Sequence, residues 1–404
     1  MHASVPAVPS DSGGHPMNKA SVKWTLSYAA VQFTFWFIYG AALAYASPYL
    51  LTCGLTNTHI GLISSAACTL SVLLQPSLAA YADRKESPSV RILLILMSAL
   101  MLIATGLLIL FTGKNGLLCG ILLGLVIVLV QLSLPLVNAL GTESINAGIP
   151  LNFGIARAFG SIGYALMSFS VGQLLARKGA QVHPLALALF CLCFLLSVSV
   201  YSFHKVRSGS EQKNDSGSFS AFIRRYPVFS IMLGGCVLIY VSHVLINNYI
   251  YQIVVSRGGT SEHMGIVMAL AGLLEMITMF LFPIMLKKKE SGFWFRLSGA
   301  FFALKALGTL LAASIPALYL VQLLQPMGWG LLTVSSVYYV NEIMQEQDRI
   351  KGQAYMTMSH TAATIFGSLI GGWLIDRTGV NGMLITAVIC GTAGTFIVWT
   401  QKQR

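Results

Sequence analysis

The stretch GLLCGILLGLVIVLVQLSLPLVNALGT, residues 116–142, carries no acidic or basic residue. A transmembrane helix needs about 20 consecutive apolar residues to cross the roughly 30 Å of hydrocarbon in a bilayer, and this stretch exceeds that length. The rest of the chain has the same character, since 55% of its 404 residues are hydrophobic and only 9% are charged. The composition therefore predicts an all-α membrane protein that crosses the bilayer many times.

Apolar runs of this kind follow one another along the chain, and they predict twelve transmembrane helices. The runs lie at 24–50, 57–82, 90–112, 115–143, 152–176, 182–203, 227–255, 261–286, 291–313, 316–344, 350–376 and 380–400. Between the sixth and the seventh run, the Ser-, Gly- and charge-rich residues 204–226 are typical of a flexible solvated linker. We therefore predict two six-helix bundles, at 24–203 and 227–400, with short tails at 1–23 and 401–404.

The basic residues predict the orientation, because positively charged loops stay on the cytoplasmic side. Of the 25 Lys and Arg residues, eighteen fall on one side and five on the other, while Arg157 and Lys305 lie within predicted spans. Both termini are therefore expected in the cytoplasm. Residues 1–23 contain no apolar run typical of a cleavable signal. The expected location is the plasma membrane, and the protein is expected to be a monomer.

Several function classes are disfavoured by the sequence. The net charge of +12 follows mainly from basic loops lying against an anionic leaflet, so it is no argument for nucleic acid as a partner. The seven cysteines are not spaced as pairs of metal ligands are. The CxC pair formed by Cys191 and Cys193 is interpreted as two small residues that pack between helices. A GxxxxGK[ST] phosphate loop, HExxH and GxSxG are all absent. We therefore expect neither an enzyme nor a bound metal or cofactor. The expected coupling ion is a proton.

Short repeats relate the two halves of the chain. Each is weak alone, but they occur in the same order in both halves, which supports two pseudo-symmetric bundles that arose by duplication. The repeats are KES at 85–87 and 289–291, QLxxP at 131–135 and 322–326, and GIAR at 154–157 facing GQAY at 352–355. Secondary transporters use this architecture and hold the substrate near the midplane between the halves.

The segment PLNFGIARAFGSIGYAL at 150–166 resembles the fifth-helix signature of the major facilitator superfamily. Within it, the similarity is to the branch of lactose, nucleoside and phenylpropionate permeases. LLQPSLAAYADRK at 73–85 and GIVMALAGLLEMITMFLFP at 265–283 resemble further parts of this family, and the resemblance covers nearly the whole chain from Lys23. It implies a twelve-helix fold and transport by alternating access. The segment 73–85 ends in a charge cluster, Asp83, Arg84 and Lys85. We interpret this cluster as a clasp that holds the cytoplasmic ends of helices together.

Arg157 is the first candidate for substrate binding. A guanidinium inside a span costs about 2.5–3.5 kcal/mol unless it faces a partner or water. Snorkelling towards the cytoplasmic end explains Arg157 equally well from the sequence alone. The resemblance matches Arg157 to the family's substrate-contacting arginine and Tyr164 to the aromatic residue of the same signature. Asn138 is also expected to line the substrate site. It stands where lactose permease carries an acid, so recognition of a galactoside in the manner of that permease is not implied.

Glu275 is the only central one among the 13 acidic residues. In a dry cavity the ionised carboxylate is disfavoured, so this group can bind and release a proton as access alternates. We predict that Glu275 and Lys305 form a proton-coupling pair. A fixed salt bridge that locks two helices together is the alternative. The histidine and acid in the tenth helix of lactose permease match Gln325 and Gly328, so the proton site of that permease does not carry over.

Further candidates for the substrate site lie in the first and seventh spans. His243, Asn247 and Tyr251 recur every four residues and form a polar stripe that suits a cavity wall, although interhelical hydrogen bonding explains it as well. Gln32 and Trp36 combine a polar group with a ring face, as binding of a sugar or nucleobase requires. Contact between aromatic residues and lipid is the alternative for the first span.

Together these features predict a proton-coupled uptake permease in a lipid bilayer for a small polar organic solute, such as a sugar or glycoside. Symport of a nucleoside or an aromatic carboxylate is the main alternative, because the side chains predicted to line the cavity have a net positive charge. The same fold working outward would be a proton-driven drug exporter. A membrane receptor or sensor is less favoured, because no soluble sensory domain is present.

Overall fold

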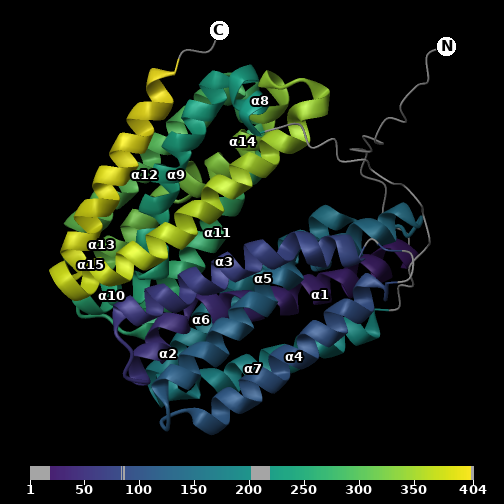
Figure 1. Ribbon diagram of the computed structural model, residues 1–404, viewed down its shortest axis with the longest axis vertical. Helices are drawn as coiled ribbons and strands as arrows, with labels where there is room; N and C mark the ends of the chain where they lie inside the picture. The colour runs from purple at the N-terminus through teal and green to yellow at the C-terminus, as the bar shows by residue number, and fades with distance from the viewer. Residues whose placement is uncertain (1–18, 83, 85–86, 202–218, 402–404) are drawn as a thin grey trace.

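The structure, a computed structural model, describes residues 19–82, 84, 87–201 and 219–401, and the regular elements in this part of the chain are all helical (Figure 1). The first bundle contains α1 (Lys19–Ala44), α2 (Ala46–Thr52), α3 (Asn57–Ala82), α4 (Val90–Phe111), α5 (Gly116–Asn146), α6 (Phe153–Lys178), the short turn η1 (Ala180–Val182) and α7 (His183–Val200). The second contains α9 (Pro227–Asn248), α10 (Ile250–Ser256), α11 (Ser261–Leu286), α12 (Ser291–Leu311), α13 (Ile315–Val321), η2 (Gln322–Leu324), η3 (Pro326–Gly330), α14 (Leu331–Ile343), η4 (Glu346–Asp348) and α15 (Arg349–Thr400).

The helices of the described residues make the predicted twelve crossings. Ten helical segments are long and apolar enough to span a membrane by themselves. The last of these includes α15, which reverses direction at Gly379, where a φ of +73° is accessible to glycine without strain. α15 therefore accounts for two crossings. α12, which carries Arg296 and Lys305, supplies the remaining one.

The first crossing of each bundle is interrupted at a tyrosine. α1 gives way to α2 at Tyr45, and α9 gives way to α10 at Tyr249. The Tyr45 hydroxyl donates a hydrogen bond to the carbonyl of Ser168 in α6, and the Tyr249 hydroxyl donates one to the carbonyl of Ser368 in α15. These two arrangements occupy corresponding places in the halves, as expected for bundles related by duplication.

The two bundles converge at one end of the molecule and diverge towards the end at which α1 begins and α15 ends (Figure 1). Within the described part of the chain, the hydrogen bonds between the bundles all lie at this converging end. Asp376 of α15 accepts from the backbone N–H groups of Asn57 and Thr58, at 3.3 and 2.7 Å. A carboxylate at the first turn of α3 is stabilised by the helix dipole. Gln252 donates to Ser47 Oγ at 2.5 Å and to Asn57 Oδ1 at 2.7 Å.

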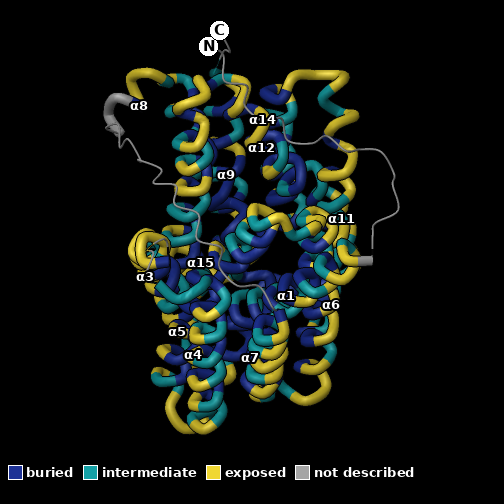
Figure 2. The backbone as a smooth tube through the Cα atoms, turned by 90° about the vertical axis from the view of Figure 1, so that its right-hand side faces the viewer, coloured by how far each residue is buried: buried dark blue, intermediate teal, exposed yellow. Residues whose placement is uncertain are grey.

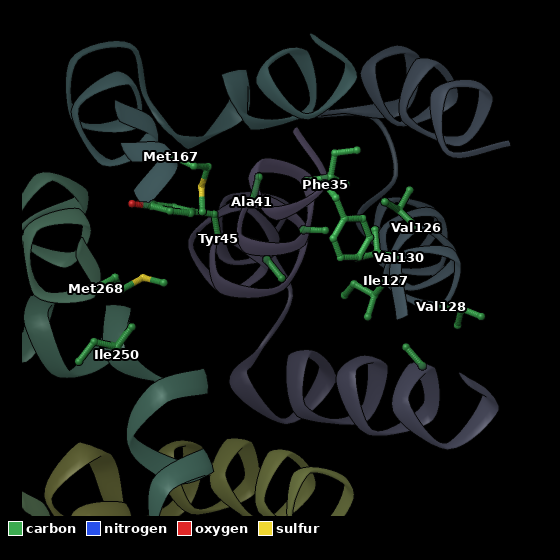
Figure 3. Packing of buried hydrophobic residues seen from close by; sticks show 14 of the residues in the cluster. Phe35, Ala41, Tyr45, Val126, Ile127, Val128, Val130, Met167, Ile250 and Met268 are labelled. Atoms are coloured by element: carbon green, nitrogen blue, oxygen red, sulfur yellow. The ribbon is translucent and has the colours of Figure 1, made fainter. Parts of the chain in front are cut away.

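The bundles hold together through tight packing of buried residues along the inner helix faces (Figure 2). Figure 3 shows Phe35 of α1 packed near Val130 of α5, with Tyr45 beside Met167 of α6. Large apolar side chains on the outer faces, such as Val200 at 75% exposure, are left for contact with acyl chains. In lipid, helices associate chiefly by close packing and not by escape from water.

The segment predicted as a flexible linker, 204–226, contains one helix in its described part. This helix, α8, spans Phe219–Arg225. Phe222 is 5% exposed, because its ring packs against Tyr226 and Tyr355 with centroids 5.1 and 4.6 Å away. The polar composition did not indicate this helix, because its anchor is a single buried aromatic residue.

Candidate functional site

A cavity of about 620 Å³ lies between the two bundles. This volume is within the roughly 300–1,000 Å³ of typical small-molecule sites. The first bundle contributes residues of α1 and α6 to its wall, and the second contributes residues of α9, α11, α12, α15 and the segment around η3. The cavity brings together seven residues predicted from the sequence to bind the solute or carry the proton: Trp36, Arg157, Tyr164, His243, Asn247, Glu275 and Lys305.

Arg157 lies over the indole ring of Trp36, with its guanidinium carbon 4.4 Å from the ring centroid. This cation–π contact compensates part of the hydration that the guanidinium loses. Gly160, one turn further along α6, makes room for the indole, because a Cβ there would lie 2.5 Å from the Trp36 Cδ1. The Arg-x-x-Gly spacing of the fifth-helix signature therefore places a cation on α6 against a ring on α1.

Gln32 lies behind Trp36 and does not line the cavity. It is 1% exposed, and its Oε1 accepts a hydrogen bond from Trp36 Nε1 at 3.3 Å. Its Nε2 donates to the Tyr28 hydroxyl at 2.7 Å, and that hydroxyl donates to the Val137 carbonyl at 2.8 Å. The predicted direct contact between Gln32 and solute is thus replaced by an indirect role, because this chain of hydrogen bonds orients the indole.

Arg157 forms no ion pair with any residue that the structure describes, since the ion pairs found there all involve Asp348. Its guanidinium faces the cavity between the bundles. A guanidinium stacked on a ring keeps its in-plane N–H groups free to hold two oxygens of one ligand. This geometry suits a carboxylate or a pair of neighbouring hydroxyls.

The second bundle supplies an aromatic wall. The His243 ring stacks on Trp329, with centroids 4.5 Å apart and an interplanar angle of 11°. Asn247 Nδ2 donates to His243 Nε2 at 2.8 Å. The His360 ring contacts Trp329 with centroids 5.3 Å apart. Two members of the predicted polar stripe therefore face the cavity, whereas Tyr251 lies beyond the break at the end of α9 and does not line it.

Glu275 and Lys305 line the same cavity but are not joined directly. Lys305 is 2% exposed, and its Nζ donates to Gln325 Oε1 at 2.5 Å. The side chain of Gln325 also lies near the Glu275 carboxyl. Neither Glu275 nor Lys305 belongs to an ion pair within the described chain. A neutral amide thus lies beside both members of the expected coupling pair.

Gln325 and Trp329 both belong to an irregular stretch of the tenth crossing. η3 is a π-helical turn, with the Gly330 N–H bonded to the Gln325 carbonyl at 3.3 Å. Pro326 has no N–H to donate, which interrupts the regular ladder at this point. Such turns are frequent at functional sites because they redirect side chains. Here the turn presents one amide and one indole to the cavity.

Other predicted residues lie elsewhere or outside the described residues. Asn138 in α5 does not line the cavity, and its Oδ1 is buried without a hydrogen-bond partner. Of the predicted clasp, Asp83 and Lys85 lie outside the described residues. Arg84 is exposed at the end of α3, and its backbone N–H bonds the Tyr81 carbonyl at 3.2 Å.

Gln325 and Trp329 are site residues that sequence reasoning did not select. Hydropathy treats the run at 316–344 as one regular span and does not distinguish its faces. The signal that could have found them is PMGWG at 326–330, because a span interrupted by Pro and Gly is a pointer to a transporter binding site.

A family profile described as "MFS_1 like family" matches residues 25–384. The chain belongs to this family. Membership agrees with the twelve-helix fold and the central cavity, and members of this fold are multi-pass membrane transporters. The narrower likeness to the lactose and phenylpropionate permeases does not follow from this match. No curated protein matches the chain.

Solved transporters share the MFS fold of this chain. A mutant of the nucleoside transporter NupG is similar with a TM-score of 0.77 at 14% identity, over 93% of this chain and 98% of that one. A bacterial homologue of the human lysosomal transporter Spinster, inward-facing and unoccupied, gives 0.66 at 13% identity, over 96% and 98%. A POT family transporter in complex with a thioalcohol-conjugated peptide gives 0.69 at 13% identity, over 93% and 95%. At these identities the likeness establishes the fold alone.

Proposed function

We propose that this MFS transporter takes up a small polar organic solute together with a proton, by alternating access in the plasma membrane with both termini in the cytoplasm. The proposed solute carries a ring and at least two neighbouring oxygens, as a sugar or glycoside does. The main support is Arg157, whose guanidinium faces the cavity and stacks on Trp36 at 4.4 Å without an acidic partner among the described residues. A cation in this setting is stabilised further by a ligand that supplies oxygens.

The coupling role is proposed for Glu275, supported by its place in the same cavity as Arg157. A buried carboxyl group that lines a cavity without a direct ion pair gains a proton more readily than one held in such a pair. Moving one proton inward through 100 mV releases about 2.3 kcal/mol, which supports roughly fifty-fold accumulation of the solute. A pH gradient adds to this driving force.

A nucleoside or an aromatic carboxylate is the second candidate for the solute. The stacked His243 and Trp329 rings favour a planar partner, because aromatic faces attract one another in offset or edge arrangements. NupG, one of the proteins with the same fold, is a nucleoside transporter. A carboxylate would match the excess of Arg157 and Lys305 over Glu275 in the cavity wall. Outward drug transport would instead exchange one inward-moving proton for the outward-moving solute.

Purified protein in proteoliposomes tests the proposal. We expect a sugar or glycoside to raise the thermal unfolding temperature in a panel that also contains nucleosides and aromatic carboxylates. The same solute should then drive proton movement into vesicles that hold the protein. Stabilisation by the other two classes alone would move the assignment to them. Solute binding without any proton movement would remove the coupling from the proposal.

A further inference from the structure

Within the part of the chain that the structure describes, Lys305 and Glu275 are the residues of opposite charge that the second bundle contributes to the cavity wall, and Gln325 lies beside both. Gln325 is 3% exposed, and its Oε1 accepts from the Lys305 ammonium at 2.5 Å. The amide oxygen thereby faces the cation, which leaves the NH₂ group, a donor only, available to the neighbouring Glu275 carboxyl. The orientation of the amide dipole matches both neighbours.

The backbone that follows Gln325 is fixed to α11 at two places, Thr278 and Glu275. The Thr278 hydroxyl donates to the Pro326 carbonyl at 2.9 Å. At the other end of the π turn, Gly330 lies so close to α11 that a Cβ there would be 2.9 Å from the Glu275 carbonyl oxygen. The main chain at Gln325 is therefore held close to the segment of α11 that carries the acid.

A direct contact between Lys305 and Glu275 would have a different effect from the neutral amide. At low dielectric an ammonium within about 4 Å stabilises a carboxylate strongly and opposes its protonation. A hydrogen bond from a neutral amide stabilises the same carboxylate less, because no full charge is involved. The spacing of cation and acid consequently decides how readily the acid accepts a proton.

We propose that Gln325 is a positioning residue that keeps Lys305 and Glu275 apart, so that Glu275 can gain and lose the coupled proton while Lys305 stays hydrogen-bonded. This inference rests on the proposed coupling role of Glu275. The other charged or titratable groups that line the cavity are Arg157 of α6, His243 of α9 and His360 of α15. Within the described residues, none of these three side chains forms a hydrogen bond or an ion pair with Lys305 or Glu275.

The test is Gln325→Leu, which keeps the side-chain volume approximately but removes the amide and, with it, the hydrogen bond to Lys305. Without the amide, Lys305 and Glu275 should pair directly. We expect solute exchange between equal pools to stay within about twofold of the wild type, while uphill accumulation falls about tenfold or more. The pH at half-maximal uphill uptake should move lower by about one unit, because tenfold more protons are then needed. Gln325→Met serves as a second variant if the first does not fold.

Gln322→Leu is the matched control. Gln322 lines the same cavity and is also buried, but its Nε2 donates to the Leu318 carbonyl at 3.2 Å and to no charged group of the described residues. Its substitution should leave the ratio of uphill uptake to exchange and the pH profile unchanged. An equal loss of exchange and uphill uptake in Gln325→Leu and Gln325→Met, with an unmoved pH profile, would reduce Gln325 to a packing residue and overturn the inference. Wild-type exchange without any proton dependence would instead refute the proposed coupling itself.

Discussion

Arg157 and Lys305 are both cations within the bundles, but their surroundings differ. The Arg157 guanidinium rests on the Trp36 ring and faces the cavity. The Lys305 ammonium is 2% exposed and is held by Gln325. A buried cation with a satisfied hydrogen bond is a structural and electrostatic element, whereas one with unused donors is suited to bind a ligand. On the basis of this difference we propose that Arg157 binds the solute and that Lys305 belongs to the coupling machinery.

Arg157→Lys tests the first assignment. The lysine keeps the charge but loses the planar fork that holds two oxygens and the flat face that stacks on Trp36. We expect the affinity for the solute to fall about tenfold or more, with little change in thermal stability. Isothermal titration of the transported solute checks this. Unchanged affinity would leave Arg157 as a snorkelling side chain.

Glu275→Gln tests proton coupling. The glutamine resembles the protonated acid, so accumulation against a gradient should be abolished while binding and exchange persist. If Glu275 serves only to neutralise Lys305, the variant should instead lose about 3–5 kcal/mol of stability, because a buried cation is left uncompensated. Combining Glu275→Gln with Lys305→Met would then restore both stability and accumulation. Parallel measurements of exchange, uphill uptake and thermal unfolding distinguish these outcomes.

The helices meet at the converging end through two equivalent seams. In one, α6 packs on α11 where Gly172 and Gly265 lie so close that a Cβ on either would overlap backbone atoms of the other helix. In the other, α15 packs on α3 at Gly372 and Gly61. Small residues allow helices to approach closely in membranes. Closure at this end therefore depends on the absence of side chains at a few positions.

Gly61→Val should weaken this closure. A Cβ at Gly61 would overlap the Ser368 carbonyl oxygen, and such overpacking costs about 1–3 kcal/mol in the closed arrangement. The cavity should then open more often at the converging end. In a cysteine-free background, a cysteine replacing Ala44, which lines the cavity, should react about fivefold faster or more with an impermeant thiol reagent added outside cells.

The matched control for this prediction is Gly106→Val, because a Cβ at Gly106 meets no atom within 4 Å. Its labelling rate should equal that of the parent protein. Equal rates for the Gly61 and Gly106 variants would mean that the seam between α3 and α15 does not limit opening.

At the scale of the whole molecule, the bundles form a V whose inner faces line the cavity (Figure 1). The open side of the V is the side on which the larger group of basic residues is predicted to lie. In the proposed orientation the cavity therefore faces the cytoplasm. Rocking of the bundles about the central cavity would close this side and open the other.

The orientation can be tested by labelling the segment between the bundles. Cysteines placed at 204–226 should react only with reagents that reach the cytoplasm, because eighteen of the 25 basic residues are predicted on that side. A membrane-impermeant reagent added to intact cells should leave them unmodified, and permeabilisation should expose them. Modification of this segment in intact cells would reverse the proposed topology.

The sequence alone was sufficient for the twelve-helix fold and for its most important charged residues. Hydrocarbon admits only segments whose backbone bonds are satisfied internally, so length and hydropathy determine where the helices cross. The same solvent makes each internal charge costly, which is why Arg157, Glu275 and Lys305 stand out without any structure. The positions of the predicted spans and of the described helices agree within a few residues along most of the chain.

The tertiary structure alone decided which polar side chains share the cavity and how they are connected. Gln32 and Trp36 are one turn apart, yet one lies behind the other, because the rotation of α1 is set by its packing against α6, α7 and α5. The position of Gln325 depends on the π turn at η3. This turn places the amide beside Lys305 and Glu275, which lie 20 and 50 positions earlier in the chain. Hydropathy averages over such a turn, whereas the contact of Gly330 with the backbone at Glu275 fixes it in space.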